Sequence, residues 1–415
     1  MNQALLRSTL CRAHARAIES MRFDARTADF VRRSVQGDRI TLIAAGKGAT
    51  AMADGALQVL GDRARAGLVV CPDPGPERPL PARIRVLHAP HPVPDLRSVL
   101  AAEACLALAA STPAEDTLLV LISGGASSLL CAPPAGMALA EKMDVVAALL
   151  RSGASIREVN TVRRHLSRVK GGRLAQASAA TVVCAIASDV VQGECHDVGS
   201  GPACADPTSI EQAHEVLVRA LGDGRASRLL PWMTEGLSPE SADSQRIRAQ
   251  ILVDPQALGA EVASLVREEG IAATTEVVEH CTVEELARRL VELSRTLEPG
   301  SAQVITCEPV IRLVEGAGRG GRAGWVALRV ALDPALGEDA AVLCGASDGT
   351  DGTSGSAGAC VSRDVIEGRD REALQRALDA CSDAQAHADL GTRIEGGATG
   401  LNLCDVYVCA RAQPA

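Results

Sequence analysis

Aromatic side chains are scarce in this 415-residue chain, where they make up 1% of the residues. They are Phe23, Phe30, Trp232, Trp325 and Tyr407. The core must therefore be aliphatic, and the chain offers little on which a base could stack, as bases do in single-strand binders. The net charge of −9 also lacks the basic footprint of a nucleic-acid binder. We expect no nucleic acid among its partners.

Metal-binding cysteine pairs and long apolar runs are missing as well. The 14 cysteines include no Cys-x-x-Cys pair, which is the spacing typical of structural zinc sites. Most of them lie inside apolar runs, where a thiol packs as a small hydrophobe. No apolar run approaches the roughly 20 residues that cross a bilayer. Residues 1–20 carry charge throughout, which favours an amphipathic helix over a signal peptide. We expect a soluble, cytoplasmic protein with no membrane partner.

Short apolar runs alternate with helical patterns along most of the chain, which is typical of an α/β fold with a largely parallel sheet. The length allows two domains, each with its own core. The pattern restarts near Ser238, so we expect domains at residues 1–237 and 238–415. Strands are expected at residues 40–45, 67–71, 117–122, 181–187, 250–253, 272–278, 302–307, 310–314 and 340–344.

Glycine-rich turns follow two of the expected strands. Gly46-Lys47-Gly48 lacks the upstream glycine and the following hydroxyl of a P-loop, which excludes a Walker A motif. Lys47 can still reach a phosphate held at a helix N-terminus. In SGGASS, residues 123–128, the glycines let the backbone approach an anion while the next helix presents free amides. The residues of this candidate anion site are Ser123, Gly124, Gly125 and Ser127.

Two further stretches in the first half carry charge in suggestive places. Residues 157–175 form a basic helix and its exit loop, in which Arg164 and Arg168 lie four apart and repel each other. Either solvent screens these charges or an anion brings them together, and the spacing leaves both open. Asp189 directly follows an expected strand, a usual place for a metal ligand or a base.

GAGRGG, residues 316–321, matches the dinucleotide fingerprint. However, the acidic residues about 20 positions on, Glu338 and Asp339, precede the next strand, whereas the fingerprint places its acid at a strand's carboxyl end. We interpret the segment as a close-approach turn that delivers Arg322. A nicotinamide-dependent reductase remains the alternative.

GASDGTDGTSGSAGAC, residues 345–360, follows another apolar strand and is poor in side chains. Its backbone amides suit an anion. Its two carboxylates, Asp348 and Asp351, suit Mg²⁺, which prefers one or two carboxylates together with water and phosphate. The alternative is a mobile surface loop.

Taken in order, these stretches resemble the glycerate 2-kinase family, the two-domain type whose C-terminal module is called MOFRL and some of whose members are labelled hydroxypyruvate reductases. The matching segments are AAGKGATAMA, HPVPD, LISGGASSLL, VNTVRRHLSRVKGGRLA, SDV, GSGP with DPTS, SDGTDGTSGSAGA and ATGLN. The resemblance implies a Rossmann-like, mostly parallel N-terminal domain, a smaller α/β MOFRL-type domain and an active-site cleft between them. It also implies transfer of the γ-phosphoryl group of ATP to the 2-hydroxyl of D-glycerate, with Mg²⁺.

Carried over by position, the resemblance makes Lys47, Asp189 and Arg322 catalytic, with Asp189 expected to take the proton of the hydroxyl. It makes Asp348 and Asp351 the metal ligands. The residues expected at substrate and phosphate are Ser123, Gly124, Gly125, Ser127, Arg164, Lys170, Gly171, Gly172, Glu308 and Asn402. The expected ligands are ATP, Mg²⁺ and a small hydroxy acid, and a homodimer is a candidate assembly.

The chain departs from the family pattern near this site. The asparagine, glutamine and glutamate that follow the family's Gly-Gly-Arg are here Ala323, Gly324 and Trp325, and Cys404 replaces an asparagine. Val191 and Gln192 stand where the family has proline and glycine. Losing polar groups from a site built to hydrogen-bond a small acid should weaken recognition. A changed hydroxy-acid substrate, or a binding protein without catalysis, is therefore a second hypothesis.

Overall fold

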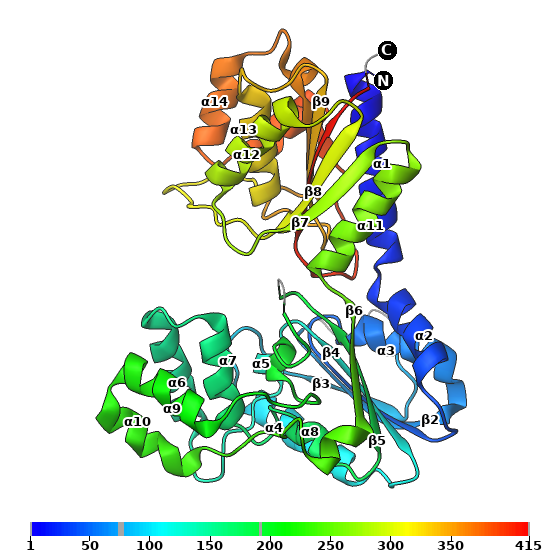
Figure 1. Ribbon diagram of the computed structural model, residues 1–415, viewed down its shortest axis with the longest axis vertical. Helices are drawn as coiled ribbons and strands as arrows, with labels where there is room; N and C mark the ends of the chain where they lie inside the picture. Colours follow the sequence, from blue (N-terminus) through cyan, green and yellow to red (C-terminus); the bar gives the residue numbers. More distant parts are fainter. Residues whose placement is uncertain (1, 74–78, 191–192, 414–415) are drawn as a thin grey trace. The chain divides into compact units, whose positions relative to one another are not determined.

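The computed structural model describes residues 2–73, 79–190 and 193–413, so Val191 and Gln192 lie outside the described residues. The chain forms two compact units, drawn in Figure 1. One is Phe23–Leu252, and the other combines Met1–Arg22 with Val253–Ala415. Each contains a six-stranded sheet with helices packed on it, which confirms the expected α/β class.

The unit Phe23–Leu252 is built on a sheet in the order β3-β2-β1-β4-β5-β6. The neighbouring pairs from β3 to β5 are all parallel. The strands are β1 (Ile40–Ala45), β2 (Ala64–Cys71), β3 (Ile84–His88), β4 (Thr117–Ser123), β5 (Thr181–Ala187) and β6 (Ile247–Val253). All six β1 residues are buried because helices cover both faces, which is why the strand appears as one apolar run. Strand order reverses between β1 and β4, the place where α/β sheets usually bind ligands.

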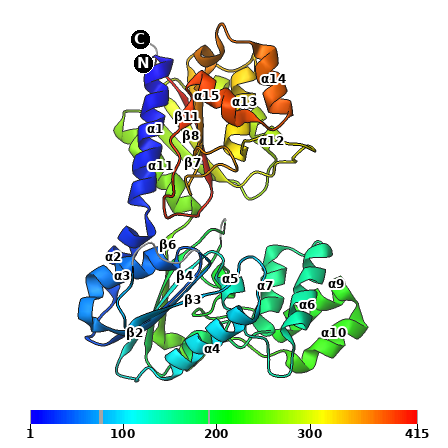
Figure 2. The same ribbon diagram turned by 180° about the vertical axis from the view of Figure 1, so that it is seen from behind.

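Helices cover the two faces of this sheet and also form a separate bundle (Figures 1 and 2). On one face lie α2 (Phe23–Ser34) and α3 (Ala49–Leu60), and on the other α4 (Leu96–Ala110) packs beside the short α5 (Ala126–Leu129) and α8 (Arg173–Gln176). The bundle has its own apolar core. Its helices are α6 (Leu139–Arg151), α7 (Ile156–His165), α9 (Ile210–Leu221) and α10 (Asp223–Leu229).

The second unit has a mixed sheet in the order β11-β10-β9-β12-β8-β7. Only the pair β7–β8 is parallel among the described pairings, so the expectation of a largely parallel sheet is right for the first unit and wrong for this one. The strands are β7 (Ala272–Val277), β8 (Ser301–Cys307), β9 (Ala340–Ala346), β10 (Gly358–Ser362), β11 (Arg393–Ile394) and β12 (Asp405–Arg411).

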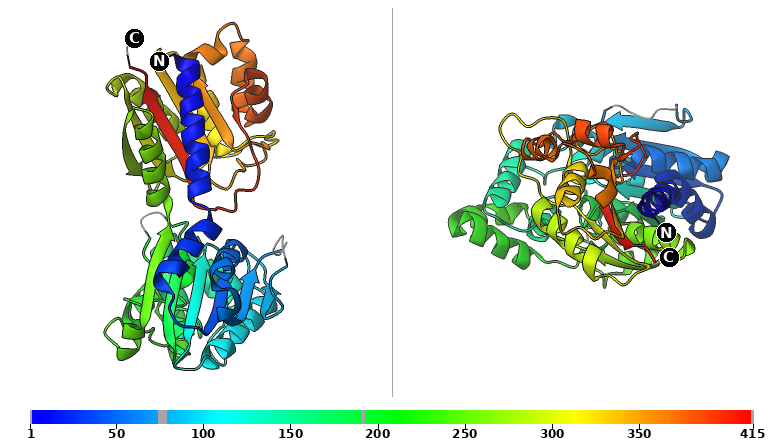
Figure 3. Two further views of the ribbon diagram at one scale, coloured as in Figure 1. Left: turned by 90° about the vertical axis from the view of Figure 1, so that its right-hand side faces the viewer. Right: turned by 90° about the horizontal axis from the view of Figure 1, so that it is seen from above.

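In this unit α1 (Gln3–Ser20) and α11 (Pro255–Glu268) lie side by side on one face of the sheet, as Figure 3 shows. On the other face lie α12 (Val283–Thr296) and α13 (Arg322–Leu332). Two short helices, α14 (Arg371–Asp379) and α15 (Asp383–Leu390), pack against α13. In the described part of the chain, no helix combines the length and the apolar character needed to cross a bilayer.

This division differs from the expected domains, 1–237 and 238–415, in two respects. The first helix belongs with the C-terminal region because α1 packs on α11, β9 and β10. The strand expected at 250–253 is the end of β6, which completes the first sheet, so the chain changes unit at Val253. The strand expected at 310–314 is reduced to one isolated bridge at Val310, since Leu313 is 66% exposed and finds no sheet to pack into.

Candidate functional site

The turns after β1 and β4 interlock at the carboxyl ends of these adjacent strands. The amide of Lys47 donates to the Gly124 carbonyl at 2.8 Å, and the amide of Gly48 donates to Ser123 Oγ at 2.9 Å. A Cβ on Gly46, whose φ is +134°, would lie 2.1 Å from Ser123 Oγ. The glycines are therefore needed for the two turns to touch. The Lys47 side chain projects from this junction and is exposed.

Asp189 and His91 complete the surroundings of the second turn. A Cβ on Gly124 would lie 2.1 Å from Asp189 Oδ2, and one on Gly125 would lie 3.0 Å from His91 Cδ2 and 3.2 Å from Lys47 Cγ. Burial, and then the Lys47 ammonium, lower the pKa of His91, which favours the neutral imidazole. His91 was not among the predicted site residues, and its only signal was the HPVPD segment.

Lys170, in the loop before α8, binds the short helix α5 and the Gly199 carbonyl. Its side chain is 1% exposed, and Nζ donates to Ser127 O at 2.7 Å and to Ser127 Oγ at 2.9 Å. Ser127 Oγ lies 3.2 Å from Ser200 Oγ, which donates to Asn160 Oδ1 at 3.2 Å. Burial lowers the pKa of Lys170 well below its usual range. Lys170 thus acts on the glycine-rich turn from within the protein.

Lys170→Met is expected to lower the free energy of unfolding by about 2 kcal/mol. The substitution keeps most of the volume but removes the donor to the half-buried Ser127 and to the buried Gly199 carbonyl. A buried acceptor left without a donor costs about 1–3 kcal/mol, offset in part because a buried ammonium is removed. Urea unfolding would measure it. Lys142→Met is the matched control. Among the described residues that buried lysine donates to the Leu166 carbonyl alone, and we expect a smaller loss.

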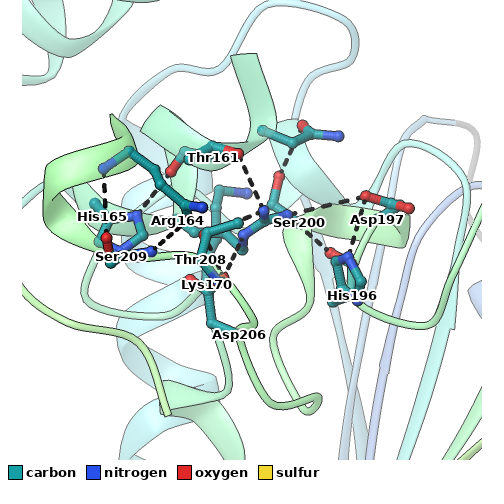
Figure 4. A network of polar contacts seen from close by, with 12 residues as sticks. Thr161, Arg164, His165, Lys170, His196, Asp197, Ser200, Asp206, Thr208 and Ser209 are labelled. Atoms are coloured by element: carbon teal, nitrogen blue, oxygen red, sulfur yellow. Dashed lines mark hydrogen bonds and ion pairs between the residues drawn. The ribbon is translucent and has the colours of Figure 1, made fainter. Parts of the chain in front are cut away.

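The Arg164 side chain is buried and makes its polar contacts within the protein (Figure 4). The side chain is 2% exposed, and its Nε lies 2.9 Å from Asp206 Oδ1. Thr208 Oγ1 donates to the same carboxylate oxygen at 2.6 Å. Arg168 pairs instead with Glu103 at 2.7 Å. Each of the two neighbouring arginines therefore has its own carboxylate, an arrangement that the helical spacing left open.

Gly171 and Gly172 follow in the same loop, both at positive φ, +58° and +79°. A Cβ on Gly171 would lie 3.0 Å from Asp206 Oδ2, and one on Gly172 would lie 2.5 Å from Leu237 Cβ. These glycines make room for the protein's own side chains.

In the second unit the central cation is Arg322, the first residue of α13. Its Nε lies 3.2 Å from Asp405 Oδ2, and its Nη1 lies 3.8 Å from Glu308 Oε2. The side chain is 35% exposed, while that of Asp405 is 5% exposed. Burial raises the pKa of Asp405 to about 7 against the opposing effect of Arg322. Asn402 is half-buried in the segment before β12.

Asp351 and Asp348 have different environments although they are three residues apart. Asp351 is 3% exposed and caps α13: Oδ1 accepts from the Ala323 amide at 3.0 Å and Oδ2 from the Gly324 amide at 2.7 Å. Burial raises its pKa. Asp348 is half-buried, and its Oδ1 accepts from the Thr350 amide at 2.9 Å. Of the two, Asp348 better fits a magnesium ligand, because both oxygens of Asp351 already hold a helix end.

No group of three or more histidine, cysteine, aspartate or glutamate side chains is placed to hold a metal ion within residues 2–73, 79–190 and 193–413. A Mg²⁺ ion at Asp348 would therefore depend on few protein ligands together with water and phosphate, which is the usual situation for this ion.

The glycines of GAGRGG contact the protein itself. A Cβ on Gly318 would lie 2.3 Å from Ser382 Oγ, one on Gly320 would lie 2.1 Å from Asp383 Oδ1, and one on Gly321 would lie 2.1 Å from Asp351 Oδ1. The segment thus ends in a tightly packed turn that leads into Arg322, as the close-approach interpretation has it. A dinucleotide would need these glycines to face its phosphates.

Asp383, which the sequence did not single out, is buried beside this turn at 1% exposure, and neither of its carboxyl oxygens has a hydrogen-bond partner among the described residues. Burial, and then Asp351, raise the pKa of Asp383 to about 7 from its ordinary 3.8. Because the unfolded chain gives up this proton near pH 4 and the folded chain near pH 7, the carboxyl destabilises the fold increasingly as the pH rises between these values.

Asp383→Asn should therefore raise the free energy of unfolding at pH 8, by about 4 kcal/mol at most, and the gain should shrink as the pH falls to 5. Denaturant unfolding of both proteins across this range measures the difference. A gain that is the same at pH 5 and pH 8 would contradict the raised pKa.

The structure thus gathers the predicted residues into two groups, one in each unit. The group in Phe23–Leu252 consists of Lys47, Ser123, Gly124, Gly125 and Asp189, with Ser127, Arg164, Lys170, Gly171 and Gly172 behind them. The group in the second unit consists of Arg322, Glu308 and Asp351, with Asp348 and Asn402 on adjoining segments. His91, Asp383 and Asp405 are additional residues that the structure brings to these groups.

The chain is similar in sequence to known proteins over most of its length. Two family models match: one described as "Domain of unknown function (DUF4147)" over residues 2–227 and one described as "MOFRL family" over residues 301–405. A D-glycerate 2-kinase from Thermotoga maritima is 34% identical over 391 residues, covering 89% of this chain and 90% of its own length. A glycerate kinase from Danio rerio is 31% identical, with 89% and 88% covered. A putative hydroxypyruvate reductase from Agrobacterium vitis is 33% identical, with 89% and 86% covered.

Two solved structures have the same overall fold. The crystal structure of a glycerate kinase from Thermotoga maritima matches with a TM-score of 0.85 and 31% identity, covering 98% of this chain and all of that one. A protein from Pyrococcus horikoshii matches with a TM-score of 0.81 and 26% identity, covering 100% and 99%.

Proposed function

The chain belongs to the glycerate 2-kinase family, with its DUF4147 and MOFRL regions, and we propose that it is a kinase that transfers the γ-phosphoryl group of ATP to the 2-hydroxyl of D-glycerate. The observation that carries the proposal is the junction of β1 and β4. The exposed Lys47 lies in the first of two interlocking glycine-rich turns at the point where strand order reverses, and the Asp189 carboxylate lies beside the second turn. Phosphoryl transfer asks a protein mainly for positioning and charge neutralisation, which these groups supply.

We assign the roles as follows. Lys47 and Arg322 neutralise phosphate charge, and Asp189 takes the proton of the attacking hydroxyl. Asp348 would hold Mg²⁺, which supplies further neutralisation of the phosphates when bound. Glu308, exposed beside Arg322, and Asn402 are assigned to polar groups of the substrates.

The basic loop has a supporting role in this proposal. The buried Arg164 pairs with Asp206, and the buried Lys170 holds the turn that contains Ser127. We therefore assign both side chains to supporting the site and not to touching substrate. Gly171 and Gly172 allow this packing.

The test is an assay of the purified protein with ATP, Mg²⁺ and a panel of hydroxy acids headed by D-glycerate. ADP release together with 2-phosphoglycerate supports the proposal. Turnover with another acid alone would assign the changed residues 323–325 to specificity, and no ADP with any acceptor would overturn the kinase. NAD(P)H fluorescence in the presence of the protein tests the reductase, which we do not favour because Gly318, Gly320 and Gly321 contact protein side chains.

We also propose a cellular location and an assembly state for this chain. All 14 cysteines are free thiols, and we place the protein in the reducing cytoplasm. Val93, Leu96 and Leu100 are 59%, 66% and 56% exposed near the start of α4, and such apolar patches often mark an interface. We therefore propose a homodimer, which light scattering would test.

A further inference from the structure

The first turn of α13, which carries Arg322, is held from the side by α15. The amide of Ala384 donates to the Arg319 carbonyl at 3.1 Å, and the amide of Gly318 donates to the Ala380 carbonyl at 3.1 Å. Both contacts lie within four residues of Arg322 on its N-terminal side. The loop that precedes the arginine is thus fastened to the segment that begins α15.

His387 of α15 reaches the other side of Arg322. Its side chain is 2% exposed, its Nε2 lies 2.8 Å from the Gly324 carbonyl and its Nδ1 lies 2.8 Å from Thr392 Oγ1. Burial lowers the pKa of His387 to about 4, so the ring is neutral. Because a carbonyl can only accept, Nε2 must carry the proton, and Nδ1 accepts from the threonine hydroxyl. One defined tautomer therefore ties α15 to the first turn of α13.

Asp383 fills the space between these two attachments. A Cβ on Gly320 would lie 2.1 Å from its Oδ1, and a Cβ on Gly324 would lie 2.2 Å from its Oδ2. The carboxyl therefore spans the backbone from two residues before Arg322 to two residues after it. A buried polar group without hydrogen bonds costs stability, so stability does not explain its presence.

We propose that Asp383 and His387 are positioning residues for Arg322: they fix the backbone turn on which the guanidinium is presented. Their action is indirect, because the ion-pair partners of Arg322, Asp405 and Glu308, come from other segments. This inference rests on the proposed role of Arg322 in phosphoryl transfer.

The inference is tested by a double-mutant cycle. His387→Leu should lower kcat for D-glycerate about tenfold with little change in KM, since a displaced Arg322 loses stabilisation of the transition state and not of the ground state. His387→Gln, which can still donate to the Gly324 carbonyl, should recover most of the rate. In an Arg322→Ala background, His387→Leu should have no further effect on kcat, because a residue that acts through Arg322 has nothing left to position.

Asp383 supplies a second pair of variants if His387→Leu does not fold. Asp383→Ala empties the space beside Gly320 and Gly324 and should lower kcat. Asp383→Asn keeps the shape of the side chain, so its kcat should stay close to that of the unmodified protein. Gln385→Ala is the control on the same helix, since Gln385 is exposed and bonds only to Asp389 among the described residues.

Each outcome decides one claim. Equal loss of kcat with and without Arg322, or failure of the Gln and Asn variants to recover the rate, overturns the positioning role while the kinase stands. Absence of turnover in the unmodified protein overturns the kinase itself, and the positioning role with it.

Discussion

Lys47→Met is expected to lower kcat for D-glycerate phosphorylation by about 10²–10³, the range for removing one preorganised charge stabiliser from a reaction site. Methionine keeps the apolar stem that packs beside Gly125 and removes only the ammonium, so the glycine turns should stay in place. The Lys47 side chain is exposed, which leaves its ammonium accessible to phosphate. Steady-state kinetics with varied ATP and varied D-glycerate measures the effect on kcat and on each KM.

Lys47→Met should leave the free energy of unfolding almost unchanged. Lys47 is exposed, and surface substitutions usually alter the free energy of unfolding by no more than about 0.5 kcal/mol. Arg65→Met is the matched control, since Arg65 is an exposed cation of the same unit but lies at the start of β2, at the opposite end of the sheet. A Lys47→Met protein with unchanged kcat would remove the lysine from the reaction.

Much of the first unit could be predicted because its signals are local. A parallel strand covered on both faces must be one apolar run, and β1 and β5 are such runs. A tight approach of two backbones needs glycine, as at Gly46 and Gly124. Since parallel strands end at one edge of the sheet, residues that follow them meet there. The grouping of Lys47, Ser123 and Asp189 follows from these rules alone.

What could not be predicted depends on partners far away in sequence. The pattern of α1 shows that it buries one face, but not that this face meets β9 and β10 from the other end of the chain. Arg164 has the same local signal whether its partner is solvent, an anion or Asp206, which lies 42 positions later. Asp351 has the composition of a metal ligand, yet its position fits the start of α13 and makes it a cap.

One departure from the family pattern has a physical reason that only the structure shows. At position 324 any Cβ would lie 2.2 Å from Asp383 Oδ2 and 3.2 Å from Asp351 Oδ2. The buried Asp383 carboxyl from α15 therefore occupies the space that a side chain at position 324 would take. Trp325 next to it donates to the Leu378 carbonyl at 3.1 Å and belongs to the packing of α13. These substitutions alter how the helix is supported while Arg322 itself is kept.

Arg322→Ala should consequently lower kcat by about 10²–10³, as for Lys47→Met. Unlike Lys47, however, Arg322 has a buried partner, so this variant should also unfold more easily. Asp405 loses its cation and must either stay protonated or ionise unpaired in a buried site. Arginine favours the ionised carboxylate, whose pKa is about 7 in its presence, so the stability loss should be larger at pH 8 than at pH 6.

These two consequences separate chemistry from folding. Arg322→Ala combined with Asp405→Asn removes the unpaired carboxylate, so it should recover stability at pH 8 and leave kcat low. Arg322→Lys restores a charge but not the planar geometry that reaches both Asp405 and Glu308, and should recover only part of the rate. If the double variant regained both stability and kcat, the role of Arg322 would be to neutralise Asp405, and Lys47 would remain the only cation assigned to the phosphates.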